Sequence, residues 1–171
     1  MRYAGIGARL TPPEEMDILE HLAAVLGTKH TLRTGGAEGA DTAFMNGCPP
    51  LVAEICLPWP KYNSKYKYKE GWYFCHNDIH PDALEIASRF HPAWNRCTPS
   101  VRKLFVRNVY VILGPFLDQP VDFVVCWTPK GEAVGGTGHA IRLASYYNIP
   151  VYNLGLSHVT AAQILKEVMH G

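Results

Sequence analysis

Three glycine-rich runs in the sequence contain the residue types that hold a phosphate group. They lie at residues 5–9, 34–41 and 134–138. Glycine lets backbone N–H groups approach an anion, and a helix that follows adds its unpaired donors and its dipole. These runs therefore predict a phosphate site. The candidate ligand-binding residues are Gly7, Ala8, Arg9, Thr34, Gly35, Gly36, Gly39, Asp41, Gly135, Gly136, Thr137 and Gly138.

Four side chains in these runs predict specific contacts with such a ligand. The guanidinium group of Arg9 can donate charge-assisted hydrogen bonds to the phosphate, and Thr34 and Thr137 can donate hydrogen bonds from their hydroxyl groups. Asp41 can either cap the helix that follows its run or accept a hydrogen bond from a ribose hydroxyl. Any single Gly-Gly pair is equally compatible with a tight turn that binds nothing. The recurrence of such pairs in two long runs favours binding.

The glycine runs lie within an alternation of strands and helices. Short apolar runs predict strands at residues 2–5, 31–34, 51–57, 121–127 and 151–153. Apolar side chains at helical spacing predict the helices, at residues 11–27, 40–45, 82–90, 99–112, 140–147 and 161–168. This order indicates βαβ units. We expect an α/β fold: a single Rossmann-like domain over residues 1–171, with a five-stranded parallel sheet and helices on both faces.

Residues 59–99 depart from this alternation and predict an insertion after the third strand. The segment is dense in Tyr, Trp, His, Lys and Pro and is too short and too polar for a core of its own. It contains soft metal ligands, at Cys75, His76, His80, His91 and Cys97. Their spacing lacks the paired Cys-x-x-Cys elements of zinc sites, so we expect no metal.

The predicted sheet brings the glycine runs together. The carboxyl ends of parallel strands meet at one edge of a sheet, so the loops after the first, second and fourth strands open on the same side. We expect Arg107, late in the helix at 99–112, to serve the dipole at the end of that helix, and reaching this glycine edge is the alternative. The sequence indicates one nucleotide-binding edge built from three loops.

Composition limits the classes of partner. A formal net charge of +1 gives no global field for DNA or an anionic membrane and argues for a small ligand. An odd number of cysteines, five, with three in apolar runs or against helix ends, indicates a reduced, cytoplasmic compartment. No stretch approaches the roughly 20 apolar residues of a membrane span, and no leader pattern is visible. We expect a soluble, unprocessed protein.

Residues 5–9, 34–41 and 135–140, with Ile149-Pro150-Val151, resemble the nucleotide loops of the SLOG superfamily of Rossmann-like domains. This superfamily includes the Lonely Guy phosphoribohydrolases and the DNA-processing protein A group. The resemblance covers most of the chain but not the insertion. It implies binding of a phosphate-bearing nucleotide or a nicotinamide-dinucleotide derivative, without a separate cofactor, by a protein that forms homo-oligomers.

The resemblance to Lonely Guy enzymes leaves a hydrolase as one alternative. Those enzymes carry a Pro-Gly-Gly-x-Gly-Thr-x-x-Glu loop whose glutamate serves N-glycosidic cleavage of nucleoside monophosphates. Here Val134, His139 and Arg142 stand at the Pro, Thr and Glu positions. Cleavage needs an anionic group near the reacting centre and an acid for the leaving base. Glu38 and Asp41 are the remaining catalytic candidates.

The resemblance to the DNA-processing protein A group leaves single-stranded DNA as another alternative. That group shares the Gly-Gly-Ala-x-Gly-x-Asp loop, which residues 35–41 match, and binds single-stranded DNA. Residues 61–69 interleave lysines with tyrosines, as strand-binding surfaces do. The near-neutral net charge opposes a large phosphate footprint. A small nucleotide therefore remains the main prediction.

Overall fold

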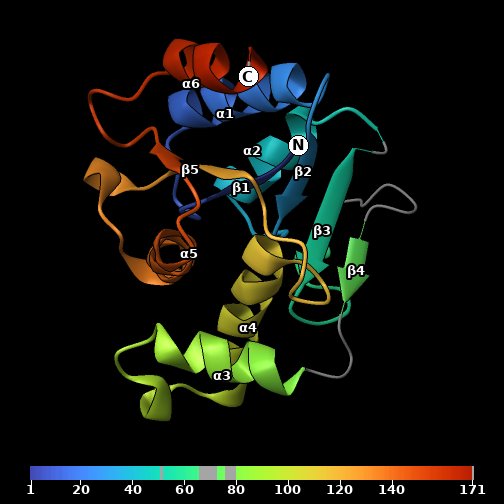
Figure 1. Ribbon diagram of the computed structural model, residues 1–171, viewed down its shortest axis with the longest axis vertical. Helices are drawn as coiled ribbons and strands as arrows, with labels where there is room; N and C mark the ends of the chain where they lie inside the picture. Colours follow the sequence, from blue (N-terminus) through green and yellow to red (C-terminus); the bar gives the residue numbers. More distant parts are fainter. Residues whose placement is uncertain (51, 66–72, 76–79, 171) are drawn as a thin grey trace.

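The computed structural model describes residues 1–50, 52–65, 73–75 and 80–170. A six-stranded parallel sheet in the order β4-β3-β2-β1-β5-β6 forms its centre (Figure 1). The five expected strands are all present. The strands are β1 (Arg2–Gly7), β2 (Thr31–Thr34), β3 (Ala53–Leu57), β4 (Tyr73–Cys75), β5 (Phe123–Trp127) and β6 (Val151–Asn153). The predicted Rossmann-like α/β fold is confirmed.

The sheet has one strand more than expected, because the insertion at 59–99 contributes β4. This strand pairs in parallel with β3 from Ile55↔Tyr73 to Leu57↔Cys75 and forms an edge of the sheet. An edge strand of three residues is fixed by backbone pairing to its neighbour and needs no apolar run of its own. The insertion therefore extends the sheet, which its polar composition did not indicate.

Helices cover both faces of the sheet, as predicted (Figure 1). One face carries α1 (Pro13–Leu26), α2 (Ala40–Gly47) and α6 (Ala161–Met169); the other carries α4 (Pro99–Leu113) and α5 (Gly135–Tyr146), with α3 (Pro81–Arg89) packed against α4. Side chains alternate along each strand, so neighbouring residues enter different cores. In β1, Tyr3 packs with the first set of helices and Ala4 with the second.

The strand order reverses between β1 and β5. From β1 the chain builds outward through β2 and β3 to β4, and it then returns to place β5 on the other side of β1 and β6 beyond it. The loops after β1 and β5 therefore lead away to opposite faces of the sheet. In open α/β sheets a crevice forms at such a switch point, outside the carboxyl ends of the strands.

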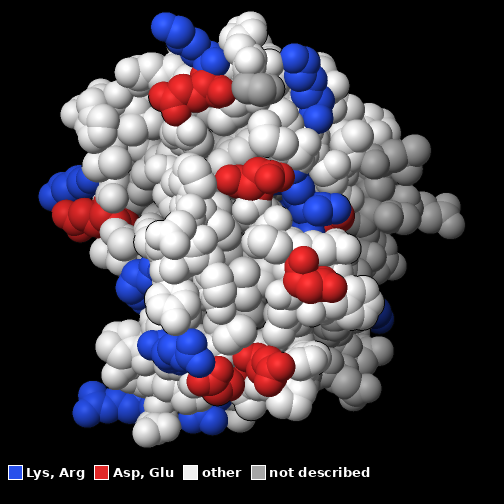
Figure 2. All heavy atoms as spheres, in the orientation of Figure 1, with Lys and Arg blue, Asp and Glu red and all other residues white. Residues whose placement is uncertain are grey.

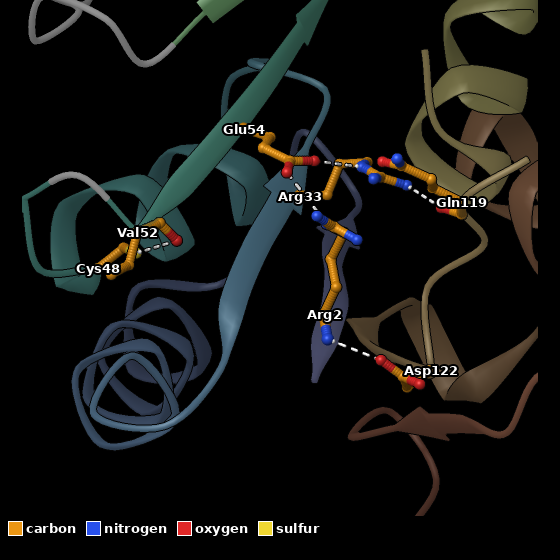
Figure 3. Close-up of polar contacts among 7 residues, drawn as sticks. All are labelled: Arg2, Arg33, Cys48, Val52, Glu54, Gln119 and Asp122. Carbon is orange, nitrogen blue, oxygen red and sulfur yellow. Dashed lines mark hydrogen bonds and ion pairs between the residues drawn. The ribbon is translucent and has the colours of Figure 1, made fainter. Parts of the chain in front are cut away.

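A buried arginine links three strands to the turn that follows α4 (Figure 3). The Arg33 side chain is fully buried, and its Nε donates to Glu54 Oε2 at 2.7 Å while its Nη1 donates to Gln119 O at 2.8 Å. Arg2 Nε donates to the other carboxylate oxygen of Glu54 at 3.0 Å. This network joins β1, β2 and β3 through side chains.

The start of α1 differs from the sequence-based expectation. The helix is predicted from residue 11, but it begins at Pro13, with Pro12 at the N-cap position and no side-chain cap hydrogen bond. The Thr11 hydroxyl instead donates to Ala8 O at 2.6 Å. Thr11 therefore stabilises the loop after β1.

Acidic and basic side chains are interspersed on the molecular face seen in Figure 2. No broad area of a single charge covers the described residues on that face, as the net charge of +1 predicts. No helix in the described part of the chain is both long and apolar enough to cross a membrane.

Candidate functional site

A cavity of about 430 Å³ opens at the switch point between β1 and β5. Its walls come from the loop after β1, the start of α5 and one side of α4, which contributes Val101, Leu104, Phe105, Arg107 and Asn108. The size is that of a small-ligand site. The crevice expected at the edge of the sheet is therefore present.

The cavity brings together residues from all three glycine runs. Of the predicted ligand-binding residues, those that line it are Gly7, Ala8, Arg9, Gly35, Asp41, Gly135, Gly136 and Thr137. Thr34, Gly36, Gly39 and Gly138 are not among the lining residues. Glu38, a catalytic candidate, is exposed and lies outside the lining.

The loop after β5 presents an uncapped helix end to the cavity. Helix α5 begins at Gly135, earlier than the expected residue 140, and the N-cap residue Val134 makes no side-chain cap hydrogen bond. Gly135 has a φ of 61°, a conformation that favours glycine. A Cβ built on Gly135 or Gly136 would meet no described atom within 4 Å, so open space lies before this helix end.

The loop after β2 is closed by its own hydrogen bonds. Asp41 Oδ2 accepts from the backbone N–H groups of Gly35 at 3.1 Å and Ala37 at 3.2 Å. Asn63 Nδ2 donates to Gly36 O at 3.1 Å. Burial raises the pKa of Asp41, while the positive charge of Arg107 and the amide donors act in the opposite direction. In this structure Asp41 stabilises its own loop.

Arg107 lies at the glycine edge, and not at the end of its helix. Its side chain is buried, at 8% exposure, and Nη1 donates to Gly35 O. Its guanidinium carbon lies 5.5 Å from the centre of the Tyr62 ring. Its Nε has no hydrogen-bond partner in the described part of the chain. The expected role at the helix dipole is therefore wrong, and the apolar residues beside Arg107 in the sequence are the signal that could have indicated a buried polar partner.

The first residues of the insertion lie at the rim of this edge. Arg9 Nη2 donates to Tyr62 Oη at 3.2 Å, and Tyr62 packs edge-on against Trp59 with ring centres 5.2 Å apart. Lys61 and Lys65 are exposed. The rest of the predicted strand-binding run, residues 66–69, lies outside the described residues.

Arg142, at the position of the Lonely Guy glutamate, makes structural contacts. Its Nε and Nη2 donate to Phe90 O at 3.2 and 3.1 Å, and its Nη1 donates to Ala133 O at 3.3 Å. The side chain thus joins the segment after α3 to the loop before α5. A carboxylate at this position could not donate to these two carbonyl groups.

No group of three or more His, Cys, Asp or Glu residues suited to a metal ion occurs in the described part of the chain. Cys97 Sγ lies 3.7 Å from His91 Nδ1. The His80 ring instead accepts a hydrogen bond from the Asp82 amide at the start of α3. The Cys75 side chain and His76 lie outside the described part.

No protein-family model and no curated protein matches the sequence. Among solved structures, DNA processing protein A from Helicobacter pylori superposes with a TM-score of 0.56 and 20% sequence identity, over 98% of this chain and 72% of that chain. The chain is similar in fold to DNA processing protein A. The work on that neighbour concerns how DNA processing protein A binds single-stranded DNA. At 20% identity the likeness shows the fold alone.

Proposed function

We propose that the chain binds a nucleotide unit at the β1/β5 edge, with the phosphate at the N-terminus of α5. The observation that carries this proposal is that the uncapped turn at Gly135, Gly136 and Thr137 lines a cavity of about 430 Å³. The first N–H groups of a helix have no intrahelical acceptor and attract anions. Arg107 adds a buried positive charge to the same cavity.

The base has an apolar wall to occupy. Val101, Leu104 and Phe105 of α4 line the cavity, and Ile6 near the end of β1 is a further apolar lining residue. Apolar and aromatic contacts supply most of the buried area in small-ligand sites, and a few polar groups fix the orientation. This wall and the helix end together suit a ligand with one apolar and one anionic part.

The same cavity favours binding without cleavage. Among the described residues that line it, Asp41 is the one carboxylate, and its Oδ2 already accepts two amide hydrogen bonds. Glu38 lies outside the lining, and residue 142 is an arginine. N-glycosidic cleavage needs a well-placed acid and a group that stabilises developing positive charge. We therefore expect no free base after incubation with nucleoside monophosphates.

Single-stranded DNA is the second candidate, with the nucleotide unit as part of a strand. The fold likeness to DNA processing protein A supports it. Arg9, Tyr62 and exposed Lys61 also lie at or beside the rim, where a strand could extend beyond the cavity. Aromatic rings with interleaved cations are typical of strand-binding surfaces.

Thermal melting against nucleosides, their 5′-monophosphates, ADP-ribose and NAD tests the main proposal. A ligand at a hundred times its dissociation constant stabilises the fold by about 2.7 kcal/mol. We expect monophosphates to raise the melting temperature more than nucleosides do. Gly136→Asp should abolish this shift through charge repulsion, and Gly136→Asn is the size-matched control.

Fluorescence anisotropy with a labelled oligothymidylate distinguishes the two sources of the nucleotide unit. Salt-sensitive binding of the oligonucleotide, without a melting shift by any mononucleotide, would favour single-stranded DNA. A melting shift without oligonucleotide binding would favour the small nucleotide. The absence of both a melting shift and oligonucleotide binding would overturn the proposal.

A further inference from the structure

A chain of hydrogen bonds joins α3 of the insertion to the first turn of α5. His139 Nε2 lies 2.9 Å from Ala87 O of α3, and His139 Nδ1 lies 3.4 Å from Asn108 Nδ2 of α4. The same Asn108 Nδ2 donates to Gly136 O at 3.0 Å. The path thus runs from the insertion to the helix end proposed to hold the phosphate.

The partners in this chain fix the state of the His139 ring. A carbonyl oxygen only accepts, so Nε2 must carry the proton that binds Ala87 O, and Nδ1 is then the acceptor for the Asn108 amide. The ring is fully buried and packs on Phe105 with centres 4.7 Å apart. Burial, with smaller contributions from Arg142 and His91, lowers the pKa of His139 to about 4. His139 is therefore a neutral ring of one tautomer at neutral pH.

The bond from Asn108 controls the orientation of one peptide unit. Gly136 O and the Thr137 N–H belong to the same planar peptide and point in opposite directions. Holding the oxygen towards Asn108 therefore directs the Thr137 N–H the other way. Gly136 has no side chain and open space lies beside its Cα, so no side-chain packing of its own adds to the helix backbone in holding this peptide.

A second tie connects the same two parts of the molecule. Arg142 donates to Phe90 O just after α3 and to Ala133 O just before α5. Two buried or half-buried side chains of α5, His139 and Arg142, thus each reach back to the α3 segment. The position of α3 is therefore coupled to the glycine loop at two points: Ala133, just before α5, and Gly136, in the first turn of α5.

We infer that His139 is a positioning residue for phosphate binding: through Asn108 it holds the Gly136–Thr137 peptide so that its N–H faces the anion. This inference rests on the proposed function, and it assigns a part in that function to His139, which does not line the cavity. It also assigns a role to the insertion, because Ala87 of α3 anchors the ring.

The experiment compares His139→Leu with His139→Gln and His30→Leu. Leucine removes both hydrogen bonds, whereas glutamine keeps a donor for Ala87 O and an acceptor for Asn108. His30 is the matched control, because it is also buried and bonds to a backbone carbonyl, that of Val168, but on the other face of the sheet. Asn108→Ala breaks the same path if His139→Leu does not fold.

Two measurements are made on each variant: the ¹H–¹⁵N resonances of Gly136 and Thr137 without ligand, and the dissociation constants for adenosine 5′-monophosphate and inorganic phosphate. We expect His139→Leu to move both resonances and weaken binding about tenfold. His139→Gln should restore both, and His30→Leu should change neither. If His139 had a purely structural role, His139→Leu and His30→Leu would both be less stable than the wild type, but neither would show moved resonances or weaker binding.

The outcomes separate this inference from the proposed function. If the wild-type protein binds adenosine 5′-monophosphate and His139→Leu binds it equally well, the positioning role is overturned. Unchanged Gly136 and Thr137 resonances in His139→Leu overturn it whether or not any ligand binds. If these resonances move as expected but the wild-type protein binds neither probe, the phosphate role is overturned and only the hydrogen-bond path stands.

Discussion

The guanidinium group of Arg107 donates a hydrogen bond to the carbonyl oxygen of Gly35, so α4 reaches across the sheet edge to the end of β2. The same side chain lines the cavity. We expect Arg107→Met to weaken nucleotide binding at least tenfold, since a charge-assisted hydrogen bond contributes about 1.5–3 kcal/mol. Calorimetric titration with a nucleoside monophosphate measures the effect.

Lys103→Met is the matched control for Arg107→Met. Lys103 belongs to the same helix, is exposed and lies outside the cavity lining. The two variants lose the same charge, so a global electrostatic effect would weaken binding equally in both. Such equality would show that Arg107 does not contact the ligand.

Of two glycines at the cavity, only one should lose stability when it is replaced by alanine. A Cβ on Gly7 would lie 2.5 Å from Ala40 Cβ and 2.7 Å from Trp127 O, so Gly7→Ala should lower the free energy of unfolding by about 2 kcal/mol or more. A Cβ on Gly136 meets no described atom within 4 Å. Gly136→Ala should therefore leave stability unchanged within about 0.5 kcal/mol. Urea unfolding of both variants gives the comparison, and similar losses would contradict it.

The carboxylate of Glu54 compensates the fully buried charge of Arg33 (Figure 3). Removing one partner of a buried ion pair leaves an uncompensated charge. Because Glu54 is itself 29% exposed, we expect Glu54→Gln to lower the free energy of unfolding by about 2 kcal/mol. Glu85→Gln is the control: its partner Arg89 is exposed, so the loss should stay below about 0.5 kcal/mol. Equal losses in denaturant titrations would contradict this account.

The lowered pKa of His139 predicts a loss of stability in acid. The folded protein holds this ring neutral down to about pH 4, whereas the unfolded chain binds the proton near pH 6.5. The unfolded state therefore binds more protons in this range, and stability falls as the pH decreases from about 6.5 to 4, by up to about 3 kcal/mol. Denaturant unfolding across this range should show a shallower fall for His139→Gln. Identical slopes for the two proteins would contradict the neutral ring.

The sequence indicated the parts of the site that local chemistry determines. Strands buried on both faces read as apolar runs, and glycine pairs mark the turns that follow them, so β1, β2 and β5 and their loops could be predicted. The position of Arg142 was also identified as unusual by comparison with the Lonely Guy loop. Its contacts with Phe90 and Ala133 depend on tertiary packing and could not be read from the motif.

The features that the sequence did not indicate depend on contacts between distant segments. Asn108 enters the site, and Arg107 reaches the glycine edge instead of the end of its helix, because α4 packs against α5 and the central strands. Burial of Arg33 likewise requires Glu54 from β3 and Gln119 from the turn after α4. Strand β4 lies in a short apolar run within a polar segment, and its place in the sheet is defined by pairing with β3.

The pairing of β1 with β5 has a consequence for the order of events during synthesis. Gly5 pairs with Val125, so a chain still emerging from the ribosome contains one wall of the cavity long before the other is made. Early βα units can pack on each other, but contacts between such distant residues form slowly because of the entropy of closing a long loop. If a ligand binds at this cavity, it can therefore stabilise the chain only after the first turn of α5 has been synthesised, and it would not assist shorter nascent chains.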